Sequence, residues 1–127
     1  MRNVAVLLVE DDSDLSEALR LYLDCQGFSV KVATDGGEAL TILFQSKKTI
    51  DVVVTDLMMP GVDGIELIRQ LRNCGELKDL PVIAMTASDE GFIAQAKDAG
   101  VDVVLRKPGD FDILADTIDQ TVEQKAA

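Results

Sequence analysis

The chain has 127 residues, with 23 acidic residues against 12 lysines and arginines, a net charge of −11 and no histidine. This length fits one domain, and we expect residues 1–127 to form it. The acidic excess argues against nucleic-acid binding by this chain and against an anionic membrane surface. The absence of histidine excludes Ser-His-Asp and Cys-His catalysis, histidine-ligated zinc and a histidine phosphocarrier role for this chain.

The sequence shows no membrane-spanning or export pattern. Its longest clean apolar run, Val4–Val9, is too short to span a membrane, and no basic segment precedes an apolar stretch as in a signal peptide. The two cysteines, Cys25 and Cys74, are far apart and form no C-x-x-C pair. We therefore expect a cytoplasmic protein with reduced thiols and no membrane contact.

Five short apolar and β-branched runs predict strands, and stretches of helical periodicity separate them. The first helix follows the first strand; Ser13 or Asp14 is expected to cap it and Gly27 to end it. A later helix is capped by Ser88 and closes at Gly100. The predicted strands are Val4–Val9, Phe28–Ala33, Val52–Thr55, Val82–Thr86 and Val101–Leu105, and the other helices are Gly36–Gln45, Asp63–Asn73 and Asp110–Glu123.

This regular alternation predicts an α/β fold. Strands joined by helical crossovers run parallel, so we expect a doubly wound five-stranded sheet in the order 2-1-3-4-5 with five helices. In such sheets, ligands bind beyond the carboxyl ends of the strands. The residues that end each strand are therefore the first candidates for chemistry.

Polar side chains stand at the ends of four predicted strands. They are Glu10, Asp11 and Asp12 after the first, Asp56 after the third, Thr86 at the end of the fourth and Lys107 after the fifth. Carboxylates from neighbouring strands repel each other unless a cation lies between them. Oxygen-only ligands suit Mg²⁺, which typically takes one or two protein carboxylates together with water and phosphate oxygens.

Asp56 can also act as a nucleophile, because a carboxylate attacks phosphorus to give an acyl phosphate. Phosphoryl transfer chiefly needs alignment and positive charge around the equatorial oxygens. Lys107 can supply an ammonium and Thr86 a hydroxyl hydrogen bond.

Four segments together resemble the receiver domain of bacterial two-component response regulators, of the chemotaxis-regulator-like, single-domain kind. They are VLLVEDD, VVVTDLMMPGVDGIEL, PVIAMTAS and AGVDVVLRKP, and the resemblance covers essentially the whole chain. It implies a flavodoxin-like receiver fold. It also implies transfer of a phosphoryl group from a partner's phosphohistidine, on a sensor histidine kinase or histidine phosphotransfer protein, followed by switching of a surface that binds a downstream protein target. Such a chain catalyses only its own phosphorylation and dephosphorylation, as a monomer or weak dimer.

The resemblance assigns a role to each strand-end position. Asp56 matches the phosphoacceptor, and Glu10 and Asp11 match the acidic pair that holds Mg²⁺ with Asp56 and the backbone carbonyl of Met58.

The remaining roles concern the phosphoryl group itself. Thr86 matches the switch hydroxyl, Ala87 matches the small residue that admits the phosphoryl group, and Lys107 matches the lysine that pairs with it.

The chain departs from the family pattern at several positions. Val104 stands where receivers often carry a switching aromatic, and the last helix lacks the arginine-rich pattern of regulators that dimerise to bind DNA. The resemblance implies that Met58 and Ser88 occupy two positions that tune hydrolysis. Because a thioether cannot orient a water molecule by strong hydrogen bonding, we expect slower self-dephosphorylation than with Asn or Glu at position 58.

Other readings remain open. The chain can be a free-standing protein or a receiver module of a longer regulator or hybrid kinase, and Met1 and the polar tail Glu123–Ala127 modestly favour the former. A haloacid-dehalogenase-type hydrolase also uses a strand-end aspartate and Mg²⁺, but wants a second aspartate where Met58 stands. A nucleotide- or flavin-binding module would need a glycine-rich loop after the first strand. A phosphorylation-independent pseudo-receiver is disfavoured because every site position is filled.

Overall fold

The structure is a computed structural model and describes residues 4–45, 49–59, 63–87 and 90–126. One parallel sheet has the strand order β2-β1-β3-β4-β5, as the sequence predicted. The strands are β1 (Ala5–Val9), β2 (Ser29–Ala33), β3 (Val52–Asp56), β4 (Val82–Thr86) and β5 (Val103–Arg106). The helices are α1 (Ser13–Cys25), α2 (Gly36–Gln45), α3 (Gly64–Arg72), α4 (Glu90–Ala99) and α5 (Leu114–Ala126), with a 3-10 turn at Phe111–Ile113 before α5.

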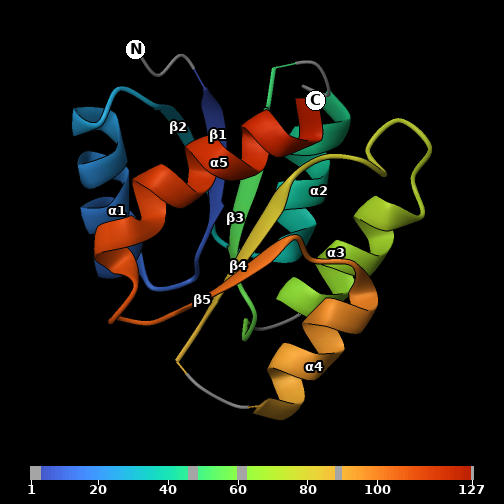
Figure 1. Cartoon of the computed structure of the whole chain (residues 1–127). Helices are drawn as coiled ribbons and strands as arrows, with labels where there is room; N and C mark the ends of the chain where they lie inside the picture. Colours follow the sequence, from blue (N-terminus) through green and yellow to red (C-terminus); the bar gives the residue numbers. More distant parts are fainter. Residues whose placement is uncertain (1–3, 46–48, 60–62, 88–89, 127) are drawn as a thin grey trace.

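Helices cover both faces of the sheet, with α1 and α5 on one face and α2, α3 and α4 on the other (Figure 1). Because helices cover both faces, the central strands are apolar on both faces. In β1, Val6 and Leu8 pack toward α1 and α5, whereas Leu7 and Val9 pack toward α2 and α3. Burying one such side chain contributes about 1.5–3 kcal/mol relative to leaving it exposed.

The start of α1 differs from the prediction. Asp12, and neither Ser13 nor Asp14, caps the helix: its Oδ1 accepts hydrogen bonds from the amides of Asp14 at 3.0 Å and Leu15 at 3.2 Å. Asp12 therefore has a structural role at the start of the helix, which separates it from its neighbours Glu10 and Asp11.

The predicted starts of β2 and β5 are also wrong, because helix ends occupy the residues in question; the other strand boundaries differ from the prediction by at most one residue. After α1, Gly27 adopts a φ of 97°, and the amide of Phe28 bonds to Leu23 O at 3.1 Å, so β2 begins at Ser29. After α4, Gly100 adopts a φ of 108° and the amide of Val101 bonds to Ala96 O at 3.1 Å. Both arrangements close a helix through a left-handed glycine.

The last helix starts later and ends later than predicted. The segment after Pro108 forms turns first, with hydrogen bonds from Asp110 N to Arg106 O at 2.9 Å and from Phe111 N to Pro108 O at 3.2 Å. Regular α-helix begins at Leu114 and continues to Ala126. No helix within the described residues has both the length and the apolar character needed to cross a membrane.

Candidate functional site

The carboxyl ends of β1, β3 and β5 bring Glu10, Asp56 and Lys107 together. Glu10 directly follows β1, Asp56 is the last residue of β3, and Lys107 directly follows β5. The ammonium of Lys107 lies 2.6 Å from Glu10 Oε1 and 3.2 Å from Asp56 Oδ2. One lysine thus forms ion pairs with carboxylates from two neighbouring strands.

A third carboxylate completes an acidic cluster. Oxygens of Glu10, Asp11 and Asp56 all lie within 4.8 Å of one another. Glu10 is buried, Asp56 is partly buried and Asp11 is exposed, so the cluster opens to solvent on one side. Three carboxylates with only oxygen donors suit a hard divalent cation such as Mg²⁺, which keeps part of its water shell and leaves positions for substrate oxygens.

The pKa values within the cluster reflect burial and mutual charge. Burial raises the pKa of Glu10 above its ordinary value of 4.5, and the hydrogen bond and positive charge of Lys107 offset this only in part. Burial alone would lower the pKa of Lys107, but its hydrogen bond to Glu10 and the negative charge of Asp56 raise it above 10.5. Lys107 therefore remains a cation at neutral pH.

The backbone around Asp56 is held by short-range contacts. Thr55 Oγ1 donates to the carbonyl oxygen of Asp56 at 2.9 Å, and the amide of Met58 donates to Asp56 Oδ1 at 3.3 Å. The first residue of α3, Gly64, approaches so closely that a Cβ there would collide with the carbonyl oxygen of Asp56 and lie 2.8 Å from Leu57 Cα. Only glycine fits this position without displacing the strand end.

Thr86 and Ala87 lie at the end of β4, next to Lys107. Thr86 is buried, and its carbonyl oxygen accepts a hydrogen bond from the amide of Lys107 at 2.8 Å. Ala87 follows and is exposed. Met85, before Thr86, pairs in register with Asp56, which places Thr86 one residue beyond the acidic cluster.

The remaining predicted positions are not members of the acidic cluster, although the amide of Met58 contacts Asp56. Val104 lies in β5 opposite Ala84 and packs, partly buried, against the apolar core under α2, α3 and α4. Met58 is 58% exposed. Ser88 lies outside the described residues.

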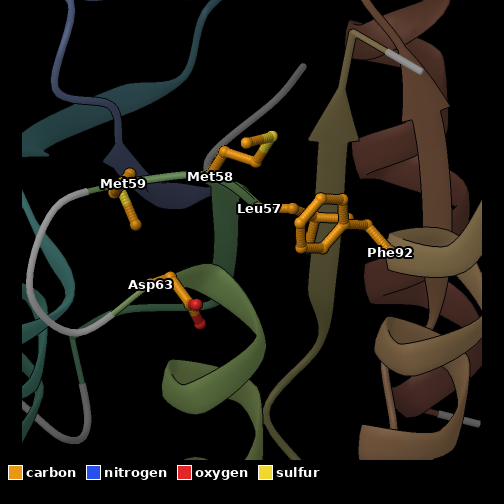
Figure 2. A pocket seen from close by; sticks show the side chains of 5 residues that line it. All are labelled: Leu57, Met58, Met59, Asp63 and Phe92. Carbon is orange, nitrogen blue, oxygen red and sulfur yellow. The ribbon is translucent and has the colours of Figure 1, made fainter. Parts of the chain in front are cut away.

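A pocket beside the cluster was not predicted. It has a volume of about 300 Å³ and is lined by Leu57, Met58, Met59, Asp63 and Phe92. Figure 2 shows Phe92 of α4 beside Leu57, with Asp63 reaching in from the start of α3. Asp63 Oδ1 also caps α3 by accepting from the amide of Glu66 at 2.9 Å. The aspartate-glycine pair that opens the predicted helix Asp63–Asn73 was the available signal for this helix start.

Comparison with known proteins identifies the family. The family model described as response regulator receiver domain matches residues 6–119. The chain belongs to this family. As a receiver domain, it is a component of two-component signalling, and a domain of this family is generally not an enzyme in the ordinary sense.

Similar proteins include both longer regulators and isolated receiver structures. The response regulator MprA of Mycobacterium sp. strain KMS is 44% identical over 106 residues, which are 83% of this receiver and 44% of the relative. The receiver thus spans less than half the length of the curated relatives it matches. A putative response regulator from Chloroflexus aurantiacus has a TM-score of 0.88 at 29% identity, with 96% of this receiver and 99% of that chain covered. The signal receiver domain of a histidine kinase from Syntrophus aciditrophicus has a TM-score of 0.85 at 29% identity, with 95% and 91% covered.

Proposed function

We propose that this receiver accepts a phosphoryl group on Asp56 from a phosphohistidine of a partner protein, in a Mg²⁺-dependent reaction. The observation that carries the proposal is the joint placement of Lys107, Glu10 and Asp56 at the ends of three strands, with a third carboxylate, Asp11, completing an oxygen-only cluster. A nucleophilic carboxylate beside a fixed ammonium is what phosphoryl transfer requires of a protein.

The transfer step forms a bond between a carboxylate oxygen of Asp56 and phosphorus. The phosphorus–nitrogen bond of the donor breaks, its electron pair stays on the imidazole nitrogen, and that nitrogen then takes a proton from solvent. Mg²⁺ held by Glu10, Asp11, Asp56 and the backbone carbonyl of Met58 would neutralise charge on the phosphoryl oxygens. The exposed Ala87 leaves room for the incoming group.

Lys107 is the group that senses the modification. In the unmodified chain its ammonium is shared between Glu10 at 2.6 Å and Asp56 at 3.2 Å. A phosphoryl group on Asp56 adds oxygens that compete for that ammonium, and the hydroxyl of Thr86 can bind another of them. Because the backbone of Lys107 is bonded to Thr86, both contacts bias the ends of β4 and β5 toward a second surface conformation that a downstream protein target recognises.

The proposed phosphohistidine donor is a sensor histidine kinase or a histidine phosphotransfer protein; residues 1–127 contain no histidine, so the donor histidine lies outside them. We further propose that residues 1–127 form one receiver domain. It can work alone or as a module of a longer regulator or hybrid kinase, since a similar receiver comes from a histidine kinase. The haloacid-dehalogenase alternative is not supported, because Met58 stands where its second aspartate is needed.

Incubation with acetyl phosphate tests the proposal without a cognate kinase. Wild-type protein with Mg²⁺ should gain the mass of one phosphoryl group, and omission of Mg²⁺ or addition of a chelator should prevent the gain. The Asp56→Asn variant should gain nothing, whereas Asp98→Asn, at an exposed acid on α4, should behave as wild type. Unmodified wild-type protein would contradict the proposal and favour a phosphorylation-independent receiver.

A further inference from the structure

Met58 differs sharply from the other described methionines in its exposure to solvent. Met58 is 58% exposed, whereas Met59 is 8% and Met85 is 2% exposed. An oxidant dissolved in water therefore reaches the sulfur of Met58 far more readily than the other two.

The exposed sulfur belongs to the residue two positions after the proposed phosphoacceptor. The amide of Met58 donates to Asp56 Oδ1 at 3.3 Å, and the Met58 side chain lines the 300 Å³ pocket together with Asp63 and Phe92 (Figure 2). The side chain of Met58 thus stands two residues along the chain from the reactive carboxylate and borders the pocket beside it, where a change of polarity at the sulfur can act.

We propose that Met58 is a site of oxidation by peroxides, and that its sulfoxide shortens the lifetime of the phosphoryl group on Asp56. This inference rests on the proposed function. In the oxidation step a sulfur lone pair attacks one peroxide oxygen and the oxygen–oxygen bond breaks. Sulfur is oxidised by two electrons, and hydrogen peroxide is reduced to water. The product carries one added oxygen on the Met58 side chain.

The added oxygen changes what the side chain can do to water. A thioether is a weak hydrogen-bond acceptor, so the unmodified side chain does not hold a water molecule in a fixed position. A sulfoxide oxygen is a polar acceptor that can hold water beside the acyl phosphate. One such hydrogen bond corresponds to about 2- to 10-fold faster hydrolysis.

Peptide mapping after graded exposure to hydrogen peroxide tests the selectivity. Dithiothreitol treatment afterwards returns reversibly oxidised Cys25 and Cys74 to thiols and leaves methionine sulfoxide in place. We expect Met58 to be oxidised at least about threefold faster than Met59 and Met85, in keeping with its exposure. Equal rates at the three methionines, or slower oxidation at Met58, would overturn the selectivity.

Acyl-phosphate half-lives test the consequence. Protein oxidised and then treated with dithiothreitol is phosphorylated with acetyl phosphate and Mg²⁺, and decay is followed by intact mass after removal of the donor. We expect a half-life about 2- to 10-fold shorter than before oxidation, and methionine sulfoxide reductase should restore it. For each variant, the half-life after oxidation is compared with the half-life of the same variant before oxidation. The half-life of Met58→Leu should not change with peroxide treatment, and that of Met59→Leu should shorten as in wild type.

The two proposals fail in different ways. Unoxidised protein that gains no phosphoryl group contradicts the proposed function and, with it, this regulation. A phosphorylated protein whose half-life is unchanged or longer after oxidation of Met58 contradicts the regulation alone.

Discussion

Lys107 Nζ lies 2.6 Å from Glu10 Oε1, although the two residues are 97 positions apart in the sequence. The contact connects the ends of β5 and β1, on either side of the proposed phosphoacceptor on β3. In the unmodified protein, Lys107 thus compensates the charge of the buried Glu10 carboxylate.

Removal of this ammonium should have opposite effects on stability and on cation binding. In Mg²⁺-free buffer, Lys107→Met leaves Glu10 buried without its counter-charge, so we expect a loss of about 1–3 kcal/mol in the free energy of unfolding. The same change removes a competing cation, so Mg²⁺ should bind several-fold more tightly. Urea unfolding and Mg²⁺ titration measure both effects. Lys97→Met, at an exposed lysine of α4, is the control. Weaker Mg²⁺ binding by Lys107→Met would contradict this account.

Mg²⁺ should stabilise the folded protein. At ten times its Kd, a ligand bound only by the folded state adds about 1.4 kcal/mol, visible as a higher Tm. Glu10→Gln, Asp11→Asn and Asp56→Asn should each reduce the effect, and Asp98→Asn should not. A Tm shift that survives the three site variants would show that Mg²⁺ acts elsewhere.

The same stabilisation should depend on pH in a defined direction. Because burial raises the pKa of Glu10 above 4.5, protons displace Mg²⁺ at a higher pH than at an exposed glutamate, and the Tm shift should shrink as the pH falls toward that value. Without Mg²⁺, stability depends on pH in the opposite direction. The contribution of Glu10 to the free energy of unfolding is present below the pKa that Glu10 has in the unfolded chain, and it is lost as the pH rises through the raised pKa of the folded state.

Gly64 and Gly75 provide a matched pair for the close approach of α3 to β3. A Cβ at Gly64 would collide with the backbone of Asp56, whereas a Cβ at Gly75 would meet nothing within 4 Å. We expect Gly64→Ala to lower the free energy of unfolding by about 1–3 kcal/mol and to slow phosphorylation, because the end of β3 must move. Gly75→Ala should be close to wild type in both measurements. Equal behaviour of the two variants would refute the role given to Gly64.

Met58→Asn should accelerate loss of the phosphoryl group. The amide side chain can orient a water molecule that the exposed thioether cannot. One hydrogen bond corresponds to about 2- to 10-fold faster hydrolysis of the acyl phosphate. Decay of the acyl phosphate after removal of the donor measures this rate, with Met59→Leu as the control at the neighbouring buried position. An unchanged or slower decay would show that position 58 does not tune hydrolysis here.

Much of the fold was predictable because local pattern and global topology agree. The apolar strands and amphipathic helices give the alternation, and parallel crossovers leave few sheet orders. Strand ends were less predictable, since Phe28 and Val101 continue apolar runs although their amides close the preceding helices. An alternating or continuous apolar pattern does not indicate where a left-handed glycine ends a helix and changes the direction of the chain.

The candidate site shows the same division between what sequence and structure reveal. Glu10, Asp56 and Lys107 could be brought together from the sequence because parallel strands end at one edge of the sheet. The sharing of Lys107 between two carboxylates, and the collision that excludes a side chain at Gly64, depend on side-chain reach and backbone distances. Those quantities follow from packing, and the pocket beside Phe92 was missed for that reason.

The position of the phosphoryl group is the most direct test of the central claim. Wild-type protein is phosphorylated with acetyl phosphate and Mg²⁺, digested under acidic conditions that preserve the acyl phosphate, and mapped by tandem mass spectrometry. The account predicts a single modified residue, Asp56, with a group that is labile to base. A phosphoryl group on Glu10, Asp11 or Asp12, or its persistence in Asp56→Asn, would contradict the account.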